Sequence, residues 1–211
     1  MFSGIVAFQS RVEKVSEAHS ILTLRVLRPK RLAAKVGESI AVNGICSTVV
    51  GVSDGVLTFE YMSETLRKTN AGALCAGDEV NLEPSLQLGE TVSGHFVLGH
   101  VDGTGVLRAI SAEGSAKCFR ISIPKNDMRY IVSTGSVTVD GVGLTVAAKE
   151  GSAFTVSLTP YTLEHTNLRL RRVRDKVNIE YDIFAKYLNA IVRSPEKSRL
   201  PSAGRHRSEP L

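Results

Sequence analysis

Few side chains in this 211-residue sequence are suited to acid–base or nucleophilic chemistry near neutral pH. His100 lies between Gly99 and Val101, and a neutral imidazole can carry a proton at that pH or act as a structural hydrogen-bonding group. Cys46 could supply a thiol, although a lone cysteine in a β-hairpin is more often a small buried apolar residue. Each of these residues therefore has both a catalytic and a structural interpretation.

The three cysteines also bear on the cell compartment and on metal binding. Cys46, Cys75 and Cys118 are odd in number and have no metal-ligand spacing, so they predict neither a disulfide framework nor a zinc site. Free thiols fit a reducing compartment, and we expect a cytoplasmic protein. No apolar stretch approaches the roughly 18 residues that a membrane span needs, so neither membrane insertion nor secretion is expected.

Composition indicates a globular chain. Hydrophobic residues make up 43% of the sequence and charged residues 22%, which is enough apolar surface for a core. The net charge of +5 is concentrated in residues 168–176, where Leu and Val separate the basic side chains. This pattern favours a solvated strand-and-turn face over an anion site. With 6% aromatic residues and no Trp, the sequence offers few stacking platforms, so nucleic-acid binding is not expected.

An internal repeat organises the chain. Residues 37–49 resemble residues 135–146, and Asn43 and Asp140 occupy the same place at a separation of 97 positions (140 − 43). Residues 65–70 recur at the same separation as 162–167, and 80–83 recur as 177–180. Three segments in one register indicate that a module of about 97 residues is used twice. The second copy begins near Leu98.

Each copy has the pattern of short β-strands. Residues 22–26, 39–42, 56–60 and 137–139 alternate with period two and are rich in β-branched side chains. Asn43-Gly44 and Asp140-Gly141 lie between apolar runs and predict tight hairpin turns, although Asp-Gly is a turn signal whether or not Asp140 has another role. Short helical turns are expected at 63–68, capped by Ser63, and at 126–130. About six strands per copy favour a closed or nearly closed antiparallel barrel.

The end of the chain departs from this pattern. Residues 183–193 have the apolar spacing of an amphipathic helix, which must pack either on its own barrel or on another chain. Residues 194–211 are rich in Pro, Ser and charge, and we expect a disordered basic tail. The predicted units are therefore a first barrel (1–97), a second barrel (98–182), the helix (183–193) and the tail (194–211).

Several motifs resemble one family. Residues 1–6, the two hairpins, 64–67, 94–97 with 99–103, and 162–167 are similar to riboflavin synthases, over residues 1 to about 192. The same superfamily includes lumazine proteins, which bind the ligand without converting it. The resemblance implies an all-β fold of two tandem six-stranded Greek-key barrels plus a C-terminal helix. It also implies a homotrimer joined through residues 183–193, sites between the first barrel of one subunit and the second barrel of its neighbour, and association with lumazine synthase.

The reaction implied by the resemblance is a dismutation. Two molecules of 6,7-dimethyl-8-ribityllumazine exchange a four-carbon unit to give riboflavin and 5-amino-6-ribitylamino-pyrimidinedione, with no external cofactor and no metal. A ring methyl must be deprotonated, a neighbouring ring carbon must be attacked, and protons must be moved. Two copies of one binding module would hold the two substrate molecules in opposed orientations, and positioning of this kind can supply several kcal/mol.

The resemblance also assigns candidate residues, position by position. The catalytic candidates are Phe2, Ser39, Cys46, His100 and Asp140. Ligand contacts assigned to the first barrel are Gly4, Ile5, Val6, Cys46, Ser47, Thr48, Glu60, Tyr61, Met62, Ser63, Glu64 and Thr65. Those assigned to the second barrel are Gly99, His100, Val101, Thr134, Gly143, Leu144, Thr145, Ser157, Leu158, Thr159, Pro160, Tyr161 and Thr162. His95 and His165 are expected to be structural or solvated.

This sequence departs from the family pattern at some ligand-facing positions. Gly143 stands where the second hairpin normally has Ser, and Thr134 replaces a Lys. In the same way Leu98 replaces a Ser and Thr159 an Ile. Loss of one hydrogen-bond donor to a developing charge can cost about 3–4 kcal/mol. The sequence therefore predicts a riboflavin synthase and keeps a non-catalytic lumazine- or flavin-binding protein as the alternative.

Overall fold

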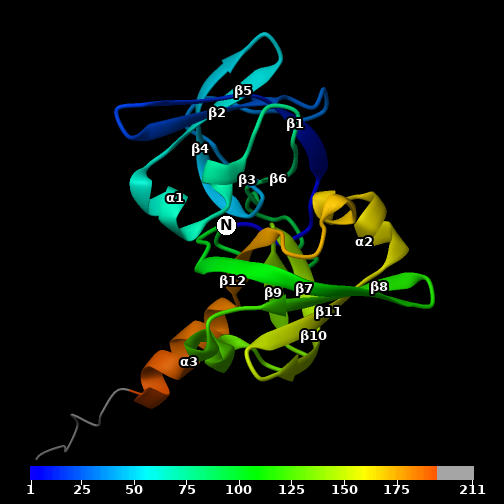
Figure 1. Cartoon of the computed structure of the whole chain (residues 1–211). Helices are drawn as coiled ribbons and strands as arrows, with labels where there is room; N and C mark the ends of the chain where they lie inside the picture. The colour runs from blue at the N-terminus through cyan, green and yellow to red at the C-terminus, as the bar shows by residue number, and fades with distance from the viewer. Residues whose placement is uncertain (194–211) are drawn as a thin grey trace, which may run out of the picture.

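The computed structural model describes residues 1–193 and contains two closed, six-stranded antiparallel barrels (Figure 1). The strands of the first barrel are β1 (Phe8–Ala18), β2 (Ile21–Leu27), β3 (Ser39–Val42), β4 (Ile45–Ser53), β5 (Val56–Tyr61) and β6 (Glu79–Pro84). The strands of the second are β7 (Gly103–Glu113), β8 (Ala116–Ser122), β9 (Ser136–Val139), β10 (Val142–Glu150), β11 (Ala153–Leu158) and β12 (Lys176–Tyr181). The predicted fold class is confirmed.

The two barrels share one topology. The order around the first is β1-β2-β5-β4-β3-β6, and the second repeats it as β7-β8-β11-β10-β9-β12. Register shifts recur at matching places, between Val49 and Gly51 in β4 and between Val146 and Ala148 in β10. Such bulges bend a strand, which closure of a small barrel requires. The duplication seen in the sequence therefore extends to the irregularities of the strands.

Within residues 1–193, six helical segments connect or follow the strands. They are α1 (Ser63–Lys68), η1 (Ala71–Ala73), η2 (Lys125–Tyr130), α2 (Pro160–Glu164), η3 (Asn167–Leu170) and α3 (Ile183–Arg193). The expected cap at the start of α1 is wrong, because Met62 occupies the N-cap position and makes no side-chain hydrogen bond there. In α2 the Thr159 hydroxyl does accept a hydrogen bond from the backbone N–H of Thr162, at 3.2 Å.

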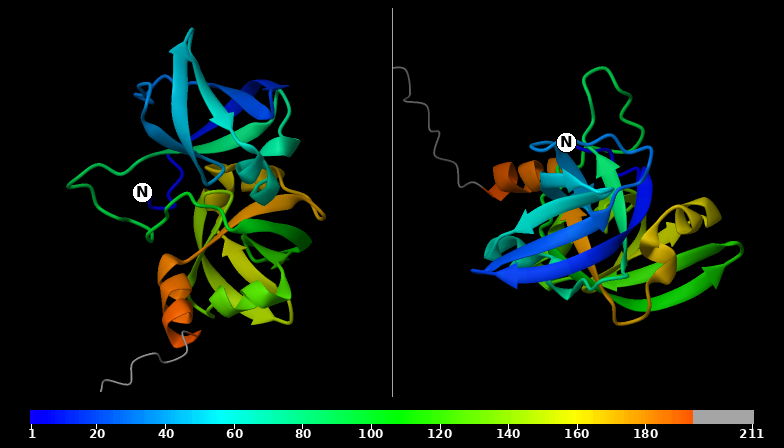
Figure 2. Two further views of the ribbon diagram at one scale, coloured as in Figure 1. Left: turned by 90° about the vertical axis from the view of Figure 1, so that its left-hand side faces the viewer. Right: turned by 90° about the horizontal axis from the view of Figure 1, so that it is seen from above.

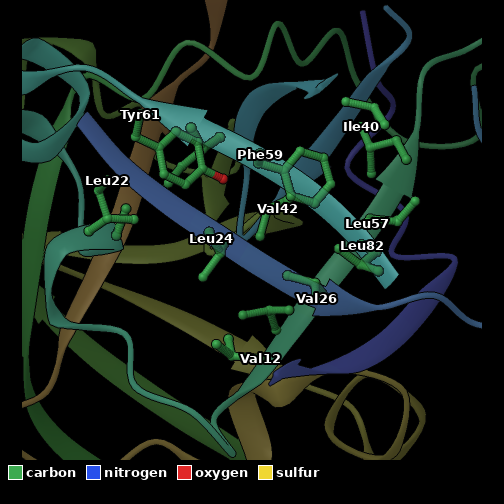
Figure 3. Close-up of a cluster of buried hydrophobic side chains, with 14 of the residues drawn as sticks. Val12, Leu22, Leu24, Val26, Ile40, Val42, Leu57, Phe59, Tyr61 and Leu82 are labelled. Carbon is green, nitrogen blue, oxygen red and sulfur yellow. The ribbon is translucent and has the colours of Figure 1, made fainter. Parts of the chain in front are cut away.

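Each barrel has its own hydrophobic core. Inward-facing side chains such as Leu24, Leu57 and Phe59 are fully buried in the first barrel (Figure 3). Phe119, Phe154 and Val156 are buried in the same way in the second. Burial of one such side chain contributes roughly 1.5–3 kcal/mol to folding. The strand alternation thus fixes which side chains fill the barrels and which remain outside for a site.

The two predicted hairpin turns are present and face each other. Asn43 and Gly44 have φ of 47° and 78°, and Asp140 and Gly141 have φ of 46° and 81°, as a type I′ turn requires. A Cβ on Gly44 would lie 2.7 Å from the backbone nitrogen of Gly141, and a Cβ on Gly141 would lie 2.7 Å from that of Gly44. The two hairpin tips are therefore in backbone contact, and only glycine fits at either tip.

Helix α3 lies beside the second barrel and extends away from it (Figure 2). Its apolar side chains Phe184, Tyr187, Leu188, Ile191 and Val192 are 59–82% exposed. Of the two packing arrangements considered from sequence, burial of this whole face on its own barrel is therefore excluded. The predicted tail, 194–211, lies outside the described residues. In the part of the chain that the structure describes, no helix has the length and hydrophobicity needed to cross a membrane.

Candidate active site

A small open cavity lies on the outside of the first barrel. It has a volume of about 170 Å³ and is lined by Ile45, Cys46, Glu64, Thr65, Lys68, Thr69, Gly99, His100 and Val101. Cys46 comes from β4, Glu64 and Thr65 come from α1, and His100 comes from the segment that leads into β7. Six residues predicted from the sequence therefore meet here, although they are up to 55 positions apart (101 − 46).

Cys46 and Gly99 are in backbone contact at the wall of the cavity. The backbone N–H of Cys46 donates to the Gly99 carbonyl at 2.8 Å. Gly99 has φ of +75°, and a Cβ there would lie 2.7 Å from Cys46 Cβ and 2.9 Å from the Phe2 ring. Glycine is the residue that this approach allows. The backbone contact therefore brings His100, the next residue, to the cavity that Cys46 also lines.

Buried carboxylates hold the segments that bring these residues together. Glu180 accepts hydrogen bonds from the backbone N–H groups of Leu98 at 2.8 Å and Gly99 at 2.9 Å. Burial raises the pKa of Glu180, and the Leu98 hydrogen bond acts against that rise. Glu83 does the same for Ser3 and Gly4 in the first copy. Sequence reasoning missed both carboxylates, although their place in the repeated 80–83 and 177–180 segments was visible.

The second hairpin receives the equivalent N-terminal segment. Gly143, the counterpart of Cys46, donates its N–H to the Gly4 carbonyl at 2.7 Å. Gly4 has φ of +78°, and a Cβ there would lie 2.9 Å from Gly143 Cα. The predicted grouping is thus wrong in one respect, because Gly4 adjoins the second barrel whereas Gly99 and His100 adjoin the first. The two segments cross where Phe2 pairs with Val97.

His95 occupies the space beside Gly143. A Cβ on Gly143 would lie 3.1 Å from Nδ1 of His95, and Nε2 of His95 lies 3.1 Å from the Thr138 hydroxyl. Burial lowers the pKa of His95, and the charge of Asp182 partly opposes this. A hydroxyl is absent at position 143, and an imidazole lies next to that position instead.

Helices α1 and α2 occupy equivalent positions in the two copies, and residues of α1 line the cavity. In α1, Glu64 pairs with Lys68 at 3.1 Å, one helical turn apart. At the equivalent positions of α2, the Tyr161 and His165 rings stack with centroids 4.0 Å apart and an interplanar angle of 16°. Lys68 and Thr69 were not predicted as site residues, although each lies one turn after a predicted one. At these positions α1 carries a charged pair and α2 carries an aromatic stack.

Other predicted residues do not line this cavity. Ser39 pairs with Thr48 across the β3–β4 ladder, on the outer face that also carries Cys46. Thr145 pairs with Ser136 in the same way beside Gly143. Phe2 is fully buried and packs with Ala41, Val97 and Cys46. Phe2 therefore contacts the cavity through Cys46, which packs against it and lines the cavity. The residues on exposed strand ends, loops and helix starts are Ile5, Glu60, Met62, Ser63, Thr134, Ser157, Thr159 and Pro160.

Other predicted contacts point into the barrels. The Ser47 hydroxyl lies 2.7 Å from the Tyr61 hydroxyl, and both residues are buried inside the first barrel. Burial raises the pKa of Tyr61 far above its ordinary value. Leu158 is fully buried in the second core, and Leu144 packs against that core. Strand alternation turns these side chains inward, away from any ligand on the outer face.

Asp140 lies in the seam between the barrels and does not line the cavity. It is fully buried, and its carboxylate contacts Arg171 Nη2 at 2.7 Å and Nε at 2.9 Å. It also accepts hydrogen bonds from Asn70 Nδ2 and the Asn178 N–H. Burial raises its pKa, while Arg171 and these hydrogen bonds oppose the rise. The geometry supports a structural role for Asp140.

The basic cluster at 168–176 is only partly the solvated face expected from sequence. Leu168 is fully buried, Arg171 pairs with Asp140, and Arg169 pairs with Glu79 and Gln9 of the first barrel. These contacts join the two copies. Among residues 1–193, no group of three or more His, Cys, Asp or Glu side chains is arranged to hold a metal ion.

Comparison with known proteins agrees with this arrangement. The Lumazine binding domain family matches residues 3–85 and 98–182. A riboflavin synthase from Mycobacterium tuberculosis (strain ATCC 25618 / H37Rv) is 42% identical over 92% of this chain and 99% of its own length. One from Bacillus subtilis (strain 168) is 34% identical over 94% and 93%.

Solved structures share the fold. LumP complexed with riboflavin superposes with a TM-score of 0.81 at 24% identity, covering 86% of this chain and 99% of LumP. LumP complexed with 6,7-dimethyl-8-(1'-D-ribityl) lumazine gives a TM-score of 0.78, covering 85% and 98%. With two matching domains and riboflavin synthases as relatives over nearly its whole length, this chain belongs to the riboflavin synthase family of lumazine-binding proteins.

Proposed function

We propose that this chain is a riboflavin synthase, which converts two 6,7-dimethyl-8-ribityllumazine molecules into riboflavin and 5-amino-6-ribitylamino-pyrimidinedione without an external cofactor. The observation that carries the proposal is the meeting of Cys46, Thr65 and His100 in the first-barrel cavity. Thiol, hydroxyl and imidazole are the groups that proton transfer and addition to a heterocycle require. The relatives at 34–42% identity carry the same name.

His100 is the proposed proton carrier. Its side chain is exposed at the cavity, and its backbone is held by Gly99, whose carbonyl binds Cys46 and whose N–H binds Glu180. An imidazole held in this way can take a proton from a substrate methyl and return it at a later step. Cys46 lines the same cavity, and its thiol is the proposed group that adds to the ring or hydrogen-bonds it.

The size of the cavity supports a shared site. A volume of about 170 Å³ is below the roughly 300 Å³ of a small ligand pocket, so the cavity needs a second wall. The proposed second wall is the second barrel of a neighbouring subunit, with Gly4, Gly143 and the Tyr161–His165 stack. The exposed apolar face of α3 is the proposed contact in a homotrimer. A cytoplasmic location and association with lumazine synthase remain proposals from the family resemblance.

A lumazine-protein-like carrier is the second candidate, and Gly143 is the observation that favours it. The hydroxyl that the family places there is absent, and a structure of LumP, a neighbour of this chain in fold, contains bound riboflavin. Such a carrier would bind ligand and form no product.

One experiment separates the two candidates. Purified protein is mixed with excess 6,7-dimethyl-8-ribityllumazine, riboflavin absorbance is followed, and bound ligand per chain is titrated in the same samples. Steady riboflavin formation supports the synthase. Tight binding without product supports the carrier, and absence of both contradicts the two proposals.

A further inference from the structure

Helix α3 contacts both ends of the segment that carries His100. The Phe184 ring packs edge-on against Phe96, with centroids 5.8 Å apart at 77°. The ammonium group of Lys186 donates to both carboxylate oxygens of Asp102, at 2.9 and 3.0 Å. Phe96 and Asp102 lie on either side of His100 in the sequence. The first turn of α3 therefore contacts this segment on both sides of His100.

Asp102 also ties this segment to β12. Its backbone N–H donates to the Ile179 carbonyl at 2.9 Å, and its Oδ2 accepts the Tyr181 N–H at 2.9 Å. Since Glu180 holds the other end through Leu98 and Gly99, these hydrogen bonds anchor residues 98–102 to residues 179–186 and to the Cys46 hairpin. The ion pair is largely shielded from solvent, with side-chain exposures of 24% for Lys186 and 26% for Asp102.

The first copy lacks this arrangement. Ala7 donates its N–H to Leu82 at 3.1 Å, as Asp102 does to Ile179, so Ala7 is the counterpart of Asp102. The side chain of an alanine can neither accept from the following strand nor bind an ammonium group. The carboxylate and its lysine thus occur only beside the segment that carries an imidazole.

We infer that Asp102 and Lys186 are positioning residues that set the His100 segment in the first-barrel cavity. The inference rests on the proposed function for its readout in turnover. Because α3 also carries the exposed apolar face, this ion pair and the Phe184–Phe96 contact link the position of the helix to the geometry of the cavity.

The test uses the full chain with Lys186→Met, Asp102→Asn and the double variant. The amide introduced by Asp102→Asn retains an oxygen that can accept from Tyr181 and loses the charge that binds Lys186. Each single change should lower kcat by about 10- to 100-fold, the cost of a small misplacement, while KM changes less than about threefold. The double variant should be no slower than the slower single variant, and Lys186→Arg should retain most activity.

The matched control is Arg120→Met, which breaks the Arg120–Glu150 ion pair on an exposed face of the second barrel, 3.1 Å between charged atoms. It should leave kcat unchanged. All variants should sediment like wild type, which separates loss of positioning from loss of assembly. Equal slowing by Arg120→Met, or additive losses in the double variant, would overturn the inference.

Hydrogen exchange supplies a readout that does not depend on turnover. In Lys186→Met, the amides of Leu98, Gly99 and Asp102 should exchange at least about tenfold faster, while those of β4 and β5 keep their wild-type rates. If wild type makes no riboflavin and exchange still accelerates, the proposed function fails and the positioning stands. Unchanged exchange, or faster exchange with unchanged kcat in an active enzyme, would overturn the positioning.

Discussion

Phe2 and Val97 exchange two backbone hydrogen bonds, Phe2 N–H to the Val97 carbonyl at 2.7 Å and Val97 N–H to the Phe2 carbonyl at 3.1 Å. Two positions after these residues, the Gly4 carbonyl accepts a hydrogen bond from Gly143 and the Gly99 carbonyl accepts one from Cys46. Each segment therefore binds the hairpin of the other copy. The pairing explains why the proposed proton carrier of the first-barrel cavity is encoded at the start of the second module.

Loss of the proposed proton carrier should affect the rate more than binding. His100→Gln removes the imidazole from the cavity and should lower kcat by about 100-fold or more, with ligand affinity within a few-fold of wild type. Cys46→Ala should act in the same direction. Stopped-flow turnover and ligand titration on the same samples measure both quantities. Unchanged turnover in either variant removes that residue from the mechanism.

Gly99→Ala should disable the site by steric conflict. The new Cβ would lie 2.7 Å from Cys46 Cβ at a φ of +75°, so the His100 segment must move away. We expect a loss of at least about 1 kcal/mol in the free energy of unfolding and a large loss of activity. Gly37→Ala is the matched control, because Gly37 has φ of +91° and nothing within 4 Å. Urea unfolding should show a smaller loss there, with activity retained.

The buried ion pair in the seam should matter for stability and not for catalysis. Arg171→Met leaves the Asp140 carboxylate buried and unpaired, and should cost about 3–5 kcal/mol in the free energy of unfolding. The double variant Asp140→Asn/Arg171→Leu copies the first module, which has Asn43 and Leu74 at these positions, and should recover most of that loss. Chemical denaturation measures both. A double variant that is stable and yet inactive would instead indicate a catalytic role for Asp140.

Glu180 should give folding a specific pH dependence. Burial raises its pKa in the folded state above the unfolded value, so the folded chain binds this proton more tightly. Its contribution is fully present below the unfolded pKa and is lost as pH rises through the folded pKa. The free energy of unfolding of wild type minus that of Glu180→Gln should therefore fall with rising pH over this window. Denaturation curves at several pH values measure it, and a flat or rising difference would contradict the assignment.

The apolar face of α3 should control assembly. Ile191→Asp places a charge on a side chain that is 69% exposed in the single chain, so the barrels should stay folded. If this face joins subunits, the variant should sediment as a monomer and lose most turnover, because each cavity then lacks its second wall. Sedimentation velocity and circular dichroism check the two parts. An oligomer that persists in this variant would place the contact elsewhere.

Much of the fold could be predicted, because hairpin turns and strand alternation are local signals. Two equivalent barrels could be predicted from the repeat together with the turn dipeptides Asn43-Gly44 and Asp140-Gly141. The site was harder, because the crossing at Phe2 and Val97 depends on pairing between distant segments. Ser47 and Tyr61 were predicted as ligand contacts from motif membership, whereas alternation along β4 and β5 turns them inward.

The glycine tips also bear on how far the two copies can diverge. Gly44 and Gly141 contact each other with no space for a Cβ, so neither can change unless the opposite tip retreats. At the next outward-facing position, Cys46 of the first copy contacts Gly99 and Gly143 of the second copy contacts Gly4. The two copies differ there, with a cysteine in one and a glycine in the other. Geometry therefore requires glycine at both tips, where the backbones of the two modules are in contact, and leaves the modules free to differ where they contact the crossed segments.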